Sequence, residues 1–375
     1  MKKLFVILSV VTALVMISVS CGEHTPYKAL VITSPDRPFE KSSGQIVKKV
    51  LEQTNLFSVK ILKTPSESGE TAALLPDLSR FNLVVVDYEG NEWSEKDQLS
   101  LVSFVKNGGG ALIFGNAVAA TSKWKSFGEI NMITGLDANG KAHEFEVRFR
   151  NTEHPLAAGL PVRWIHTSDV LASKLEGIPA NAEILATAFS DTTFGGSGKS
   201  EPVIFTMNTG KGRIFETTLG CDDGGDNPAM KCAGFLTIIQ RGAEWAAAGV
   251  VNQKVPFDFP SAAVSVSRPD LKPLSIEDDM EGLMTYQVEK STRYMVDIQA
   301  RLRDAAGNSE ELRIIEGKMV EVLKNNLTTI DAKKLILREL SWMGSDYCLP
   351  AIKELINKPE LKDEAEFALS RLNLK

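Results

Sequence analysis

The turn after the apolar run Ala111 to Phe114 is the first place where this sequence could do chemistry. In open α/β sheets ligands bind beyond the carboxyl ends of the strands, and a nucleophile stands on the sharp strand-to-helix turn. We expect Asn116 to hold that position; it is no nucleophile, but its amide can donate and accept hydrogen bonds. It suits a ligand hydroxyl or a developing oxyanion. Alternatively, Asn116 is there because the turn needs left-handed backbone angles.

His166 and Asp169 are the pair best suited to move a proton. They are three residues apart, so both face one site if the segment is helical or turned. Asp169 could act as a general base or accept a hydrogen bond from a hydroxyl; the alternative is a helix cap or a surface carboxylate. His166, between Ile165 and Thr167, is alternatively a structural residue. We predict Asp169 and His166 as the catalytic residues.

Trp124 and Cys221 complete the set of candidates. Trp124 is either a stacking platform for a ring or part of the core. Cys221 opens the acidic run 221–227, whose carboxylates could bind calcium, or zinc together with a thiolate. The spacing does not fit an EF-hand loop, which favours a solvated loop instead. We therefore predict that Asn116, Trp124 and Cys221 bind substrate; the sequence does not identify a metal or a cofactor.

Alternating strand and helix patterns must position these residues between about 28 and 249. The helices show apolar spacing, as in Ser94 to Lys106, where Ser94 is the expected cap. Near-continuous apolar strands between helices predict a parallel sheet covered on both faces. The predicted strands are Lys28–Thr33, Val59–Leu62, Leu83–Asp87, Ala111–Phe114, Phe145–Phe149, Ile184–Ala188, Val203–Met207 and Arg213–Thr217.

The pattern changes after the closing helix at Ala229 to Ala248. Residues 250–281 contain four prolines and no helical periodicity, which predicts an extended linker. Residues 282–375 carry apolar faces at helical spacing in five segments. Short antiparallel helices are typical of an α-solenoid with one or two repeats. We expect this part to pack or to bind a protein partner.

The N-terminus predicts export. Lys2 and Lys3 precede an uncharged run and Ser20-Cys21-Gly22, which is typical of a secretory signal over residues 1–20. A cysteine at this place resembles a bacterial lipobox; lipidated Cys21, followed by a tether over 21–27, would anchor the protein to a membrane. Of the other cysteines, Cys221 and Cys232 could pair, although small buried hydrophobes are the favoured interpretation. The net charge of -6, without a basic stripe, argues against nucleic acid.

Three stretches together resemble one family. They are Asn107 to Asn116, Glu153 to Pro161, and Gly210 to Gly220 with Arg241 to Ala246 after it. These resemble the ThuA-like (trehalose-utilisation) family over roughly Lys28 to Gly249. The resemblance implies a flavodoxin-like, doubly wound parallel sheet, similar to class I glutamine amidotransferases. Val255 to Pro260 and the helical tail are similar to bacterial lipoproteins that join such a domain to a small all-α HEAT-type repeat domain.

The chain departs from the family at its polar positions. Family members usually carry His where this chain has Asn116 and where it has Cys221, and their acidic motif corresponds to Ser168 to Leu171. Two imidazoles are thus replaced by an amide and a thiol.

Two functions follow from the sequence. The first is a membrane-anchored protein of carbohydrate utilisation that binds or processes a sugar or modified disaccharide. The second is a non-catalytic scaffold lipoprotein that docks a partner through its helical tail. Whether the protein is an enzyme stays open.

Overall fold

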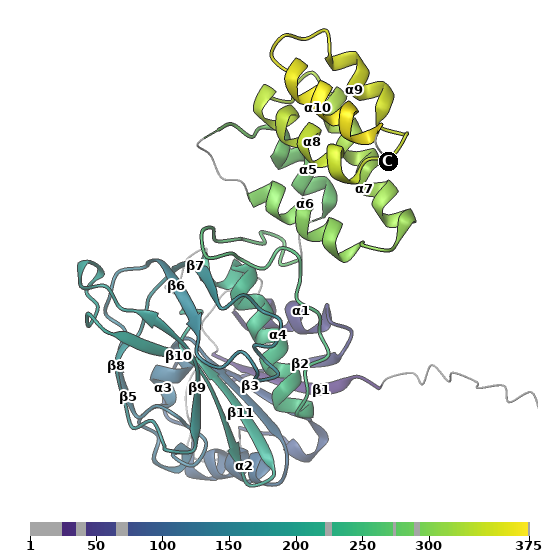
Figure 1. The fold of residues 1–375 in the computed structure, drawn as a ribbon. Coiled ribbons are helices and arrows are strands. Elements are labelled where there is room, and N and C mark those ends of the chain that lie inside the picture. The colour runs from purple at the N-terminus through teal and green to yellow at the C-terminus, as the bar shows by residue number, and fades with distance from the viewer. Residues whose placement is uncertain are drawn as a thin grey trace, which may run out of the picture.

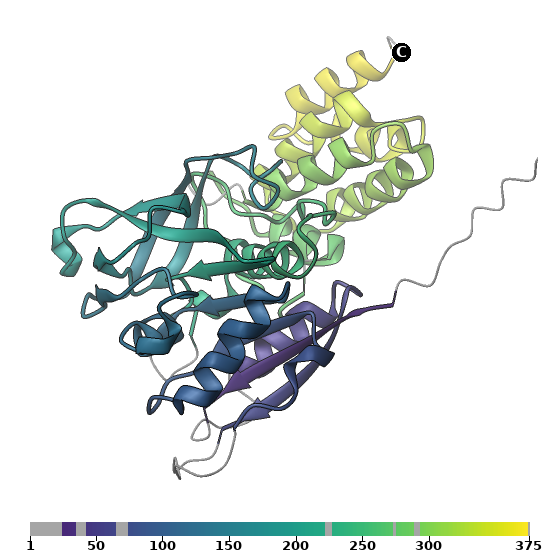
Figure 2. The ribbon, with the colours of Figure 1, turned by 90° about the horizontal axis from the view of Figure 1, so that it is seen from below.

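The computed structural model describes residues 25–34, 43–64, 74–221, 227–272, 275–288 and 293–373. Two bodies are visible in Figures 1 and 2: an α/β part built on one large sheet, and an all-helical C-terminal part. The expected signal peptide, Cys21 and residues 222–226 of the acidic run lie outside the described residues. Within the described ranges, no helix is long and apolar enough to cross a membrane.

One sheet of nine described strands forms the frame, in the order β2-β1-β3-β4-β11-β10-β9-β6-β7. The first five strands of this order run parallel, which confirms the predicted parallel sheet. The strands are β1 (Tyr27–Thr33), β2 (Phe57–Lys63), β3 (Leu83–Asp87), β4 (Gly110–Phe114), β6 (His143–Phe149), β7 (Arg163–Asp169), β9 (Ala182–Phe189), β10 (Ser200–Thr209) and β11 (Gly212–Thr217).

The other half of the sheet is antiparallel, a feature that the predicted parallel sheet did not include. Strand β10 pairs antiparallel with both β11 and β9, and β6 pairs antiparallel with β9 and β7. The β10–β11 connection is a tight turn through Gly210 at φ 61°, a conformation that glycine adopts at low cost. A hairpin this short can only join antiparallel strands. A small second sheet pairs β5 (Gly135–Asp137) with β8 (Ser173–Glu176).

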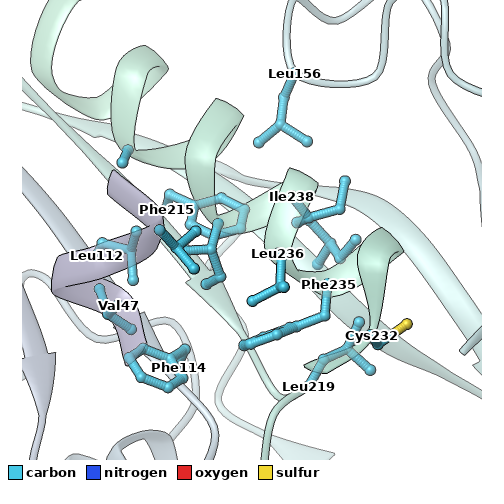
Figure 3. Packing of buried hydrophobic residues seen from close by; sticks show 14 of the residues in the cluster. Val47, Leu112, Phe114, Leu156, Phe215, Leu219, Cys232, Phe235, Leu236 and Ile238 are labelled. Carbon is cyan, nitrogen blue, oxygen red and sulfur yellow. The ribbon is translucent and has the colours of Figure 1, made fainter. Parts of the chain in front are cut away.

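Helices cover both faces of the sheet. Helices α1 (Ser43–Glu52) and α4 (Ala233–Ala248) pack on one face, while α2 (Glu95–Lys106) and α3 (Asn116–Thr121) pack on the other. Figure 3 shows the apolar core under α1 and α4, where Phe235 of α4 lies close to Phe114 of β4. The centroids of these two rings are 6.0 Å apart. Two buried apolar layers therefore fix where the strand ends lie.

The segment predicted as an extended linker is partly packed. Arg268 forms a bidentate ion pair with Asp258 at 2.6 and 2.8 Å, and both side chains are buried. Ser267 forms an isolated bridge to Cys232 at the start of α4. We call residues 250–272 the strap. Its prolines prevent regular structure, and the Arg268–Asp258 pair holds it together internally. Backbone hydrogen bonds bind it to the α/β part: the N–H of Ala233 donates to the Val266 carbonyl at 2.8 Å, and that of Ile165 to the Ser261 carbonyl at 2.9 Å.

The C-terminal part is all-helical, as predicted. Its first helix, α5 (Ile276–Met284), begins inside the segment predicted as linker, because Ser275 and Asp278 form a capping box there. It is followed by α6 (Arg293–Asp304), α7 (Ser309–Lys324), α8 (Ile330–Met343), α9 (Leu349–Leu355) and α10 (Lys362–Leu372), which share one apolar core. The assignment to HEAT-type repeats stays a prediction.

Candidate functional site

Polar side chains gather where the parallel strands β1, β3 and β4 end. The chain passes from β1 to β2 on one side and then returns to β3 on the other side of β1. This reversal is the topological switch point, at which open α/β sheets bind ligands. Six residues lie there and form what we call the switch-point cluster: Thr33, Ser34, Ser43, Asp87, Glu89 and Asn116.

Asp87, the last residue of β3, is the centre of this cluster. The hydroxyl of Ser43, at the start of α1, lies 2.7 Å from both carboxylate oxygens of Asp87. The hydroxyl of Thr33, at the end of β1, donates to the same carboxylate at 3.2 Å. The carboxylate also lies near the amino end of α1, which favours negative charge. A side chain at Gly44 would bring its Cβ to 3.3 Å from Asp87 Oδ2, so the helix start approaches closely.

Glu89 and Asn116 form the outer part of the cluster. The Ser34 hydroxyl accepts from the backbone N–H of Glu89 and donates to its carbonyl, both at 2.7 Å, which fixes the turn after β3. Asn116 Nδ2 donates to Glu89 Oε2 at 3.3 Å. Glu89 is exposed, whereas Asp87 and Asn116 are half-buried. The cluster thus presents carboxylate and amide groups toward solvent from a rigid frame.

The strand-to-helix turn after β4 is built on Gly115, and not on Asn116 as we predicted. Gly115 has φ 56° and ψ -130°, whereas Asn116 is the first residue of α3 and is absent from the left-handed residues of the described chain. A Cβ on Gly115 would lie 2.5 Å from the carbonyl oxygen of Gly220. The position that carries a nucleophile in related turns therefore has no space for a side chain in this protein.

His166 and Asp169 lie on strand β7 and face the same side of it. The predicted helix or turn is absent; instead a β-bulge puts one extra residue into β7, since His143 pairs with Asp169 and Phe145 with His166. Side chains three apart normally point to opposite faces of a strand, and the bulge restores the match. His166 Nε2 lies 2.8 Å from Asp169 Oδ2, and both side chains are fully buried.

Asp169 holds the backbone that follows β11. Its Oδ2 accepts from the Gly220 N–H at 2.7 Å, and its Oδ1 accepts from the Val170 N–H at 2.8 Å. Burial alone would lower the pKa of His166, but the interactions with Cys232 and Asp169 outweigh it and raise this pKa to about 10. At neutral pH His166 is therefore an imidazolium paired with Asp169.

The structure separates the remaining candidates. Cys221 is half-buried beside the Gly115 turn, and its thiol donates to the Thr218 carbonyl at 3.4 Å. Trp124 is 5% exposed and packs against the rings of Tyr88, Trp93 and Phe127, so it belongs to the core and offers no stacking platform. Cys221, Cys232 and Cys348 are all free, which excludes the Cys221–Cys232 pairing.

Sequence reasoning missed most of the switch-point cluster. It found Asn116 but overlooked Asp87, Ser43 and Glu89. The signal was present, because Thr33 and Asp87 end predicted strands and polar residues at neighbouring strand ends meet at one edge. Among the described residues, no group of three His, Cys, Asp or Glu side chains is arranged to hold a metal ion.

Comparison with known proteins places the α/β part in one family. A family model described as ThuA, trehalose utilisation, matches residues 28–246. The structure is similar to a ThuA-like protein from Parabacteroides merdae, at 35% identity and a TM-score of 0.61, over 66% of this chain and 99% of the other. A ThuA-like protein from Bacteroides uniformis matches at 15% identity and a TM-score of 0.44, over 60% of this chain and 95% of the other. None of the curated proteins compared with the chain matches it.

Proposed function

Because the chain belongs to the ThuA family of trehalose utilisation, we propose that its switch-point cluster binds a sugar or modified disaccharide. One observation carries the proposal: the switch point holds the Asp87 carboxylate, fixed by two hydroxyls, and two residues further on the Glu89 carboxylate, which pairs with Asn116. Sugar hydroxyls both donate and accept hydrogen bonds. Carboxylates accept them, and an amide does both, so these groups match a polyhydroxylated ligand.

The chemistry of this edge favours binding or proton transfer over covalent catalysis. Gly115 leaves no side chain at the elbow, and Asn116 carries no nucleophilic atom. Asp87 and Glu89 are the carboxylates in the cluster that could accept a proton from a bound hydroxyl. A covalent sugar–enzyme intermediate formed at the elbow is therefore not part of the proposal.

Asp169 and His166 act in this proposal as positioning residues. A catalytic role for Asp169 would require its carboxylate to leave the Gly220 N–H and the imidazolium, both buried with it. Its contact with Gly220 instead fixes the backbone against which Gly115 packs. The pair thereby sets the place of Asn116 and Cys221 at the edge of the sheet.

Export and membrane anchoring form a second part of the proposal. The support is the charged start, the uncharged run and the Ser20-Cys21-Gly22 sequence, which match a lipoprotein signal. Expression in a bacterial host with radiolabelled palmitate tests it: the wild type should be labelled and Cys21→Ala should not. Equal labelling of both, or labelling of neither, contradicts the anchor.

A non-catalytic scaffold lipoprotein is the alternative function. The observation that favours it is the elbow, where Gly115 excludes a side chain and Asn116 stands in place of the expected histidine. In that case the helical part would bind a partner protein, and the switch-point cluster would bind no sugar.

A thermal-shift screen separates the two functions. Residues 22–375 are heated with trehalose, other disaccharides and keto-sugars; a ligand that binds only the native state raises Tm. The proposal predicts a shift with one sugar class that is lost in Asp87→Asn and Asn116→Ala. The control Asp77→Asn, before the amino end of β3, should keep it. No shift with any sugar, or a shift unaffected by the cluster variants, contradicts the proposal.

A further inference from the structure

A basic hollow in the helical part is unexplained by the proposed function. Its volume is about 380 Å³, and it lies between the ends of α7 and α9 and the start of α8. Three lysines line it, together with one carboxylate: Lys324, Lys333, Lys358 and Glu354. These four charges leave a net excess of positive charge.

Lys333 is the unusual member of this set. It is only 4% exposed, and it forms no ion pair or side-chain hydrogen bond with any residue that the structure describes. Lysine is almost never buried to this extent unless it is paired. Burial and the nearby positive charge of Lys358 both lower the pKa of Lys333, so the charged form of Lys333 is disfavoured at this place.

Ordinary helix electrostatics explain two of the lysines but not the third. Lys324 is the last residue of α7, and Lys358 follows α9, so both lie near the negative ends of helices, where cations are favoured. Lys333 is in the first turn of α8, where the helix end is positive and a cation is disfavoured. The charge of Lys333 is therefore not stabilised by the dipole of its own helix.

We propose that this hollow binds a small anionic ligand through a phosphate-type oxyanion, with Lys333 as its buried contact and Lys324 and Lys358 at its rim. Lysine is a common point-charge partner of phosphate. A hollow of this volume accommodates a small phosphorylated molecule or a lipid headgroup. The bound anion would supply the counter-charge that Lys333 lacks.

The chain offers a matched control for this site. Lys334 is the next residue of α8, but it pairs with Glu364 at 3.3 Å and does not line the hollow. Lys333→Met and Lys334→Met remove the same charge and keep a similar stem. Because Lys333→Met keeps the apolar stem in place and removes only a charge without an ion-pair partner among the described residues, we expect it to fold with a Tm close to that of the wild type, so lost binding would not reflect unfolding.

Isothermal titration of the full mature chain with inorganic pyrophosphate at fixed ionic strength tests the proposal. We expect saturable binding with one site, weakened at least tenfold by Lys333→Met and unchanged by Lys334→Met. No saturable binding, or equal weakening by both variants, would overturn it. Co-sedimentation with vesicles containing phosphatidylglycerol distinguishes the source: Lys333-dependent sedimentation assigns a headgroup, and its absence assigns a soluble phosphate.

Discussion

Single residues in this protein show how burial sets chemistry. Glu216 of β11 is fully buried; its Oε2 accepts from the Met132 N–H at 3.1 Å, and its Oε1 has no partner among the described residues. Burial raises the pKa of Glu216 to about 8, and the hydrogen bond from Met132 offsets this only in part. The carboxyl is therefore neutral over most of the physiological range, unlike an ordinary surface glutamate.

Replacing Glu216 by Gln should stabilise the protein at high pH. The folded-state pKa lies above the ordinary 4.5, so wild-type stability falls as pH rises from about 4.5 to 8 and then levels off. Thermal unfolding should show no difference between Glu216→Gln and wild type near pH 4.5, and a rise in Tm of roughly 2–8 °C at pH 8.

The same substitution at Glu244 is the control for this effect. Glu244 is also buried, but its carboxylate accepts from the backbone N–H groups of Asn252 and Gln253. Glu244→Gln should therefore lower Tm. A Glu216→Gln variant that is less stable than wild type at pH 8 would contradict the account.

At the scale of elements, the bulge in β7 places Asp169 where it can bind the loop that follows β11. It lets Asp169 bind both His166 and the Gly220 N–H, so β7, at one edge of the sheet, holds the loop after β11. A buried ion pair of this kind makes each partner costly to remove, because the other is left buried with an uncompensated charge.

Replacing Asp169 by Asn should destabilise the fold by about 3–5 kcal/mol at pH 6, because the buried imidazolium loses its carboxylate partner and keeps only Cys232. Cys232 and Asp169 together raise the His166 pKa from its ordinary 6.5 to about 10, so their interactions with the imidazolium stabilise the protein fully below pH 6.5 and lose this contribution as pH rises through about 10. Urea unfolding at several pH values should show the penalty shrinking toward pH 10.

Ser168→Ala, on the same strand, should change stability little at any pH. A penalty for Asp169→Asn that stays constant from pH 6 to 10 would show that the ion pair is not its cause.

The elements also show what could be predicted from the sequence. Strand β3 was predicted with its observed bounds, because Leu83 to Val86 form a continuous apolar run. Strand β7 was missed, because His166, Thr167 and Asp169 are polar residues in buried positions. Only tertiary partners such as Gly220 and Cys232 make these residues acceptable there, and a local pattern does not contain them.

At the scale of the whole molecule, the strap joins the two bodies. Backbone hydrogen bonds fix it to the α/β part: the Arg268 N–H donates to the Lys231 carbonyl at 2.7 Å, and the Ile165 N–H donates to the Ser261 carbonyl at 2.9 Å. On the other side, the guanidinium of Arg301 on α6 lies 3.4 Å from the ring centroid of Phe257. Arg301 also pairs with Asp279 of α5 at 3.0 Å. The strap therefore contacts both the sheet domain and the helical part.

Replacing Arg268 by Met should loosen the strap, because the buried ion pair with Asp258 closes it on itself. Loss of the guanidinium leaves Asp258 buried without its counter-charge, at a cost of about 3–5 kcal/mol. Limited trypsin digestion should cut Arg268→Met after Lys254 well before wild type. Arg338→Met, exposed on α8, should be digested like the wild type. Equal resistance of Arg268→Met and wild type would show that the strap is held by other contacts.

The central claim is that the switch-point cluster binds a sugar, and hydrogen–deuterium exchange with and without a disaccharide tests it most directly. The account predicts slower exchange at the strand ends and helix starts that carry the cluster, residues 33–34, 43–50, 87–89 and 115–118, and no such protection in Asp87→Asn. Unchanged exchange at these segments with a sugar that measurably binds the protein, or protection confined to the helical part, would contradict it.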